Sequence, residues 1–226
     1  MPALVTLHVW RLPAAQVPQA LLRMAVDRSR ARRTPGTRFT KLLGTGDGRT
    51  FTVRDADLTQ WAKLTTWATP GPDRIADEWT ALATESWRLD LRPLTSTGRW
   101  SGRSPFGAPV PARHDGPVAA LTRARLSAGR AGSFWRAVPP VSAALQRSPG
   151  LLAAVGIGEA PVGLQGTVSL WRSSDALREF AHRSPEHTAA IADTSRLGWY
   201  AEELFARFAV VGSQGTLDGR DPLSPP

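Results

Sequence analysis

The segments LTTW (Leu64–Trp67) and VSLW (Val168–Trp171) are similar in sequence, which indicates that one structural element occurs twice in the chain. The residues before them repeat as well, because LGTG (Leu43–Gly46) matches VGIG (Val155–Gly158). Each tryptophan precedes a predicted helix, and the copies lie roughly 105 to 112 residues apart. This offset is typical of a small domain, so we interpret the chain as a small domain that was duplicated and fused.

Each predicted half has the element order β-α-β-β-α-β, which is the ferredoxin-like order. Apolar runs bounded by glycine or proline predict the strands, and apolar residues three or four apart predict the helices. The predicted strands lie at residues 3–11, 38–44, 61–69, 87–94, 118–126, 151–156, 163–172 and 203–211. Two such sheets usually pack face to face. We therefore expect an α+β fold in which duplicated ferredoxin-like units form an α+β barrel, with the helices outside.

Composition divides the chain into four parts. Residues 1–95 form the first ferredoxin-like half, and residues 116–211 form the second half. Residues 96–115 are rich in Gly, Pro, Ser and Arg without periodicity, which predicts a connecting loop. Residues 212–226 are predicted to form a disordered tail.

The chain has no cysteine among its 226 residues, which excludes disulfides, thiolate nucleophiles and iron–sulfur clusters. Nine tryptophans stand against one tyrosine, which suggests large rings that line a core or an apolar pocket. The N-terminus lacks a basic segment before a long apolar run, and no stretch reaches the roughly 18 apolar residues that span a bilayer. We expect a cytoplasmic protein, and contact with a membrane surface stays open.

The net charge of +9 allows a nucleic-acid or anionic-membrane partner. The arginines are scattered, however, and the only dense group is Arg28, Arg30, Arg32 and Arg33. A nucleic-acid binder of ferredoxin-like fold presents exposed aromatics flanked by basic residues, whereas the aromatics here sit inside apolar strands. We therefore expect no nucleic-acid partner.

A candidate ligand helix follows Ser184, within SPEHTAAIADTSRLGWYAEELFARF (Ser184–Phe208). Ser184 suits the N-cap, and His187 falls in the first turn, where the helix dipole keeps an imidazole neutral and able to donate a lone pair. Ala190 and Ile191 share its face and offer a small apolar surface to a flat cofactor. Taken alone, the local pattern favours an ordinary histidine bonded to backbone or water.

Three sets of segments recur in order along the chain: LHVWR (Leu7–Arg11) with RFTKLLGTGDGRTF (Arg38–Phe51), GRWSGRSPFG (Gly98–Gly107) with GPVAALTRARL (Gly116–Leu126), and VGLQGTVSLWRS (Val162–Ser173) with WYAEELFARF (Trp199–Phe208). They resemble the spheroidene monooxygenase family, the carotenoid ketolases of photosynthetic bacteria, and its actinobacterial relatives. The resemblance implies a haem-containing oxygenase with a dimeric α+β-barrel type of fold, built here from the two fused halves. It also implies oxygenation of a carotenoid at C2 to a ketone.

Haem iron needs one strong axial donor, and without cysteine a histidine is the natural candidate. The resemblance transfers this role to His187, with Ala190 and Ile191 beside the cofactor. His182, late in the preceding predicted helix, is the rival metal ligand. His8 is interpreted as a packed core residue of its strand.

The loop at Gly98–Gly107 is the second candidate region. Arg99, Trp100 and Arg103 are candidate catalytic residues, because an arginine near a haem propionate or over the distal face stabilises negative charge. The alternative is a linker that Trp100 anchors and whose arginines lie in solvent. The adjacent carboxylates Glu202 and Glu203 are interpreted as solvated.

We therefore predict a haem-dependent monooxygenase that acts on a hydrophobic, carotenoid-like substrate. Such an enzyme uses oxygen or peroxide and an electron donor, and further oligomerisation stays open. The alternative is a cofactor-free α+β-barrel protein that binds apolar metabolites.

Overall fold

The computed structural model describes residues 4–47, 53–110, 112–160, 166–183 and 185–224. The first half contains β1 (Leu4–Arg11), α1 (Val17–Arg32), β2 (Thr37–Gly46), β3 (Ala56–Trp67), α2 (Arg74–Thr80) and β4 (Glu85–Gly98). The second half contains β5 (Val118–Leu126), α3 (Ala131–Gln146), β6 (Leu151–Gly158), β7 (Gly166–Trp171), α4 (Ser174–Arg183), α5 (Pro185–Leu197) and β8 (Tyr200–Gly215). The predicted ferredoxin-like order is confirmed in both halves, and the second half adds α5.

The strands close into one antiparallel barrel in the order β1-β3-β2-β6-β7-β5-β8-β4. The halves meet at two seams, one between β2 and β6 and one between the long strands β4 and β8. At the first seam the repeated glycine stretches pair with each other, Gly44 with Gly158 and Gly46 with Gly156. The predicted α+β barrel is confirmed, and its internal repeat lies at the junction of the halves.

Alternation along the strands fills the barrel with aliphatic and aromatic side chains. Val5, Leu64 and Leu121 belong to this core, together with Phe208 from β8. Trp100, from the loop that follows β4, is fully buried in the same cluster. The barrel interior is thus a packed core, so a cofactor site must be sought outside it.

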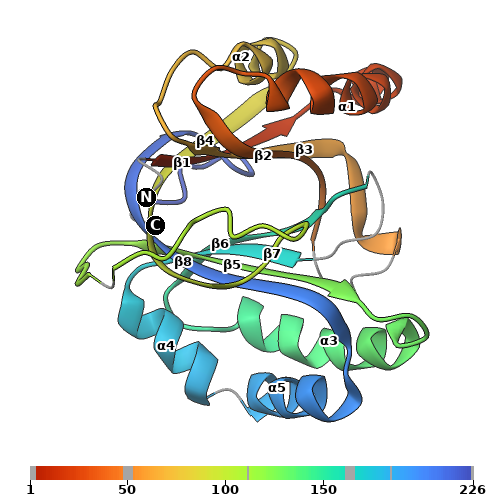
Figure 1. Cartoon of the computed structure of the whole chain (residues 1–226), viewed down its shortest axis with the longest axis vertical. Coiled ribbons are helices and arrows are strands. Elements are labelled where there is room, and N and C mark those ends of the chain that lie inside the picture. The colour runs from red at the N-terminus through yellow and green to blue at the C-terminus, as the bar shows by residue number, and fades with distance from the viewer. Residues whose placement is uncertain (1–3, 48–52, 111, 161–165, 184, 225–226) are drawn as a thin grey trace.

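Helices cover the two outer faces of the barrel, α1 and α2 on one side and α3, α4 and α5 on the other (Figure 1). Trp10 of β1, Trp61 of β3 and Trp79 of α2 are fully buried between the sheet and helices α1 and α2. The ring centroids of Trp10 and Trp61 lie 5.5 and 5.7 Å from that of Trp79. Eight of the nine tryptophans are buried, and only Trp135 is 42% exposed. The eight buried indoles therefore form part of the packed hydrophobic interior.

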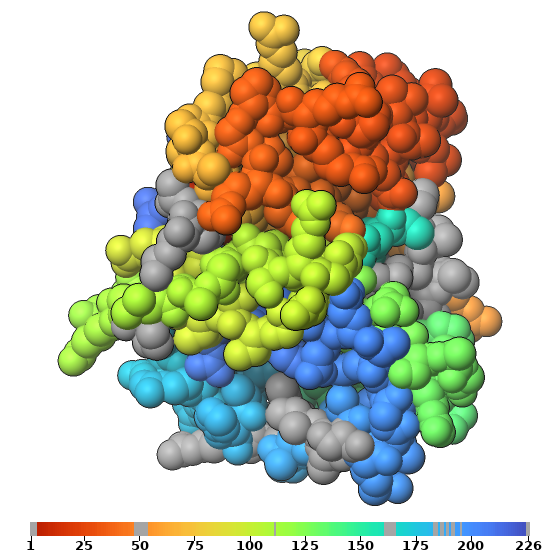
Figure 2. Space-filling model, viewed as in Figure 1, coloured from red at the N-terminus to blue at the C-terminus, as the bar shows by residue number. Residues whose placement is uncertain are grey.

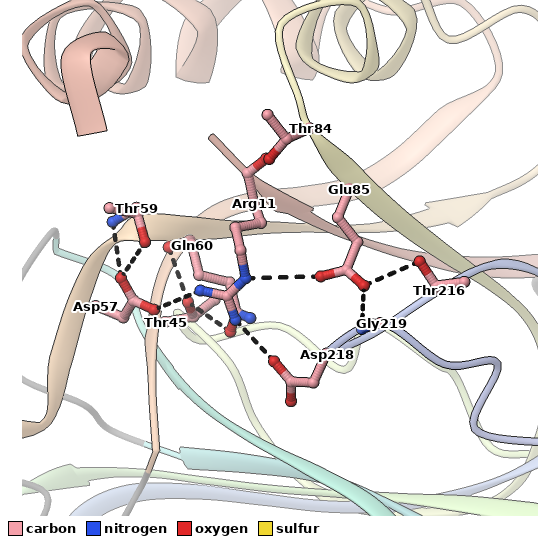
Figure 3. A network of polar contacts seen from close by, with 10 residues as sticks. All are labelled: Arg11, Thr45, Asp57, Thr59, Gln60, Thr84, Glu85, Thr216, Asp218 and Gly219. Atoms are coloured by element: carbon pink, nitrogen blue, oxygen red, sulfur yellow. Dashed lines mark hydrogen bonds and ion pairs between the residues drawn. The ribbon is translucent and has the colours of Figure 1, made fainter. Parts of the chain in front are cut away.

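The C-terminal segment is ordered to residue 224, contrary to the predicted disordered tail. β8 runs on to Gly215, and Leu217 joins the barrel core at 6% exposure. Figure 3 shows the polar contacts that hold this segment: the Arg11 guanidinium donates to Asp218 at 2.8 Å, and Glu85 accepts from the Gly219 N–H at 2.6 Å. The order of this segment could not be predicted from local sequence, because the residues that hold it lie on β1 and β4, far away in the chain.

Candidate functional site

His187 lies in the first turn of α5, as predicted. Its side chain and that of Ile191 lie outside the described residues, whereas Ala190 is half-buried. The rival His182 is on α4 with an exposed side chain. His8, interpreted as a core residue, is buried on β1 and stacks on Trp10 with ring centroids 5.5 Å apart.

The C-terminal end of α5 is fixed by hydrogen bonds and aromatic contacts. Thr194 donates to the Ala190 carbonyl at 2.8 Å, and the buried Trp199 donates from its indole to Ser133 of α3 at 3.0 Å. The ring of Tyr200 packs against α3, and burial raises the pKa of its phenol although a hydrogen bond with Thr194 acts in the opposite direction. As a whole α5 packs mainly on α3 and α4, so the helix that carries His187 is held chiefly by other helices.

The sheet surface on this side differs from the sealed surface under α1 and α2. We call Ala120, Thr122, Thr167, Phe205 and Arg207 the outer face of the second half, because strand pairing places them together on the helix side. Thr122 is exposed and Phe205 is 40% exposed, even though both point toward the helix layer. The helices therefore leave part of this outer face uncovered, and its side chains are small except for Phe205 and Arg207.

Arg207 is the charged member of that face. It pairs with Ala120 across the strands, is half-buried, and makes no side-chain hydrogen bond or ion pair with any described residue. A half-buried guanidinium without a carboxylate partner is suited to bind a carboxylate or phosphate supplied from outside the chain.

The 98–107 loop contains the predicted catalytic residues Arg99, Trp100 and Arg103. The Trp100 indole is fully buried and donates to Glu159 at 2.8 Å. Arg99 and Arg103 are exposed, and among the described residues the Arg99 guanidinium donates to the Gly102 carbonyl alone, at 3.2 Å. These contacts agree with the alternative that Trp100 anchors the loop, and a role for the arginines beside a haem stays a prediction.

A polar network that sequence reasoning missed lies around Trp100. Arg123, 3% exposed on β5, donates to Glu159 at 2.6 Å and pairs with Glu202. Lys41 of β2 also donates to Glu159. Burial raises the pKa of the Glu159 carboxyl, but the Lys41 ammonium and the Trp100 indole outweigh this and hold it below its ordinary value. The network joins residues from five separate segments, so no local sequence pattern could predict it.

Neither a multi-ligand metal cluster nor a membrane-spanning helix is found in the described part of the chain. Among its histidines and acids, no three lie together as ligands for a metal ion. No helix there combines the length and apolarity needed to cross a bilayer. A haem requires only one axial protein ligand, so the first finding is compatible with a single histidine.

No family model matches the chain, but the three proteins of similar sequence described below all carry the same name. The spheroidene monooxygenase of Rhodobacter capsulatus is 33% identical over 222 residues, which span 93% of this chain and 90% of that protein. The spheroidene monooxygenase of Rubrivivax gelatinosus is 33% identical over 82% of this chain and 73% of its own length. That of Cereibacter sphaeroides is 34% identical over 84% of this chain and 60% of its own length.

Among solved structures, an aldoxime dehydratase in complex with butyraldoxime is similar in fold. Its TM-score is 0.53 at 13% sequence identity, and the match covers 92% of this chain and 79% of that one. The low identity limits this likeness to the fold. The sequence match over 93% of the chain is decisive: the chain belongs to the spheroidene monooxygenase family, and it is an oxidoreductase of the monooxygenase class.

Proposed function

We propose that this protein is a haem-dependent monooxygenase that oxygenates a carotenoid-like, hydrophobic substrate, with His187 as the axial ligand of the iron. The observation that carries the proposal is the 33% identity, over nearly the whole chain, to a protein named for oxygenation of spheroidene. The position of residue 187 in the first turn of α5 supports the assignment of the ligand.

The residues of the second half fit a haem. A flat macrocycle needs an uncovered surface with small side chains, and the outer face of the second half offers Ala120, Thr122 and Thr167. Phe205, 40% exposed, supplies an aromatic ring for apolar contact. Arg207, which has no side-chain partner among the described residues, supplies a cation for a propionate. The outer face of the first half lacks this room because Trp10, Trp61 and Trp79 fill it.

The bound haem would supply oxygen activation, while the chain supplies ligation, orientation and exclusion of water. His187 would hold the iron through a nitrogen of its imidazole. Arg207 would fix the edge of the macrocycle by a charge-assisted hydrogen bond. Dioxygen with an electron donor, or peroxide, must come from outside the chain.

The test is the visible spectrum of the protein expressed with haem supply. We expect a Soret band that His187→Ala abolishes and that the matched variant His182→Ala leaves intact, because His182 is exposed on α4. Far-UV circular dichroism establishes that both variants fold. Incubation of the wild type with a carotenoid, an electron donor and isotope-labelled dioxygen should place label in the product.

Two results would replace the proposal. A folded wild type without a Soret band supports a cofactor-free barrel that binds apolar metabolites. Loss of the band in His182→Ala but not in His187→Ala moves the ligand to α4.

A further inference from the structure

A basic hollow of about 590 Å³ lies between α1, β2 and the 98–107 loop. The helix α1 lies on the opposite side of the barrel from α5 (Figure 1). Its charged lining consists of Arg28, Arg32, Arg38, Lys41, Arg103 and Glu159. Five cations thus surround one carboxylate. Such an arrangement attracts anions and repels cationic ligands.

The carboxylate does not neutralise the hollow. Glu159 accepts hydrogen bonds from Lys41, from Arg123 and from the Trp100 indole. Its negative charge is therefore compensated by these donors and does not offset the charge of the other arginines in the hollow. Arg38 and Arg103 are exposed and make no side-chain hydrogen bond or ion pair with any described residue. Two guanidinium groups are therefore free to bind phosphate oxygens.

The helix that forms one wall of this hollow also exposes apolar side chains. Leu22 is 68% exposed and Val26, one turn later on the same face, is 52% exposed. Arg33 continues that face beyond the end of α1 and is exposed. Figure 2 shows the atoms of α1 and of the 98–107 loop next to each other on one face of the molecule. Arginines and protruding aliphatic side chains on different sides of one surface helix are typical of surfaces that lie on a membrane.

We propose that this face docks onto a bilayer that contains anionic phospholipids. Lipid phosphates enter the hollow beside Arg38 and Arg103, and Leu22 and Val26 insert into the interfacial region. Charge complementarity argues for this occupant, because the face combines a cation-lined hollow with exposed aliphatic groups, and an anionic bilayer satisfies both. The inference rests on the proposed function for its purpose, which is access to an apolar substrate dissolved in the membrane.

The experiment measures co-sedimentation of the full chain with vesicles of phosphatidylcholine and phosphatidylglycerol in equal amounts. We expect the wild type to bind these vesicles, to bind vesicles of phosphatidylcholine alone much more weakly, and to detach as salt is raised. The double variant Arg38→Gln/Arg103→Gln should lose binding by roughly 30-fold, because each arginine near an anionic surface contributes about a factor of five.

The matched control is Arg136→Gln/Arg172→Gln, which removes the same charge from exposed arginines of the second half that have no side-chain partner among the described residues. It should bind within about twofold of the wild type. Equal losses in both double variants would show that net charge acts without this face, and would overturn the proposal. Equal binding to neutral vesicles would overturn it too.

Binding of the wild type to an RNA homopolymer that the Arg38/Arg103 variant loses, without vesicle binding, would assign the face to another partner. The vesicle measurement needs no haem, so its failure leaves the spectrum of His187 variants unaffected. The two proposals therefore fail separately.

Discussion

Glu202 holds the 98–107 loop against β8 with both of its carboxylate oxygens. Oε1 accepts from the Ser101 N–H at 2.9 Å and pairs with Arg123, while Oε2 accepts from the Gly102 N–H at 2.7 Å. Burial raises the pKa of this carboxyl, but the hydrogen bonds from Gly102, Ser101 and Arg123 together hold it below its ordinary value of 4.5. A carboxyl with a lowered pKa in the folded state stabilises the fold above its unfolded pKa, and the contribution is lost as pH falls through the folded value.

We expect Glu202→Gln to lower the free energy of unfolding by about 2 kcal/mol near neutral pH, because an amide replaces a charged acceptor of two N–H groups and a guanidinium. The difference from the wild type should shrink as pH falls below 4.5, since the wild type then loses the same charge. Urea unfolding at a series of pH values measures both effects.

Glu203→Gln is the matched control, because Glu203 is the exposed neighbour on the same strand. Its stability should stay within about 0.5 kcal/mol of the wild type. A constant difference between Glu202→Gln and the wild type down to acidic pH would contradict the assigned role of the carboxylate.

The 98–107 loop leaves β4 through Gly98, whose φ of +86° and close contact admit no side chain. A Cβ at this position would lie 2.2 Å from the Glu203 carbonyl oxygen. We expect Gly98→Ala to destabilise the fold by about 3 kcal/mol, from the left-handed backbone and from displacement of β8. Gly102 also has a left-handed backbone, with φ of +71°, but open space surrounds its Cβ position. A substitution at Gly102 therefore measures the cost of the backbone conformation alone. Gly102→Ala should lose about 1 kcal/mol by thermal unfolding, and equal losses in the two variants would contradict a tight loop–strand contact.

Much of the element order was predictable because the local periodicity of apolar residues indicates whether a segment is a strand or a helix. The strand predicted at 118–126 matches β5 (Val118–Leu126) in both bounds. The strand at 203–211 was predicted too short, because β8 extends to Gly215 on contacts with β4 that no neighbouring residue reveals. The ends of the elements thus depend on distant pairing, while their kinds depend on nearby residues.

The site was less accessible to sequence reasoning. His187 stood out through its place after Ser184, a cue that is local. Glu202 was interpreted as solvated because its partners, Arg123 and the Ser101 N–H, come from other segments. Arg207 carried no signal either, since its lack of a side-chain partner within the described part of the chain is a property of the folded outer face.

Closure of the barrel links the two halves into one unit. β4 and β8 pair along most of their length, from Trp87 with Gly215 to Gly98 with Leu204. The C-terminal segment then returns to the first half, where Asp218 meets Arg11 and Leu217 enters the shared core. The last residues of the second half therefore stabilise strands at the start of the first.

We expect Leu217→Ala to destabilise both halves equally, by about 2 kcal/mol, because a 6% exposed leucine is removed from a core that spans the whole barrel. Native-state amide hydrogen exchange measures this when β1 and β7 are followed as reporters of the two halves. The slowest amides of both strands should lose protection by the same factor. The control is Val211→Ala, because Val211 is 55% exposed on β8, the strand that leads into the C-terminal segment. This variant should leave the protection of both β1 and β7 unchanged. Loss of protection in β1 alone would mean that the halves unfold independently, in spite of the closed sheet.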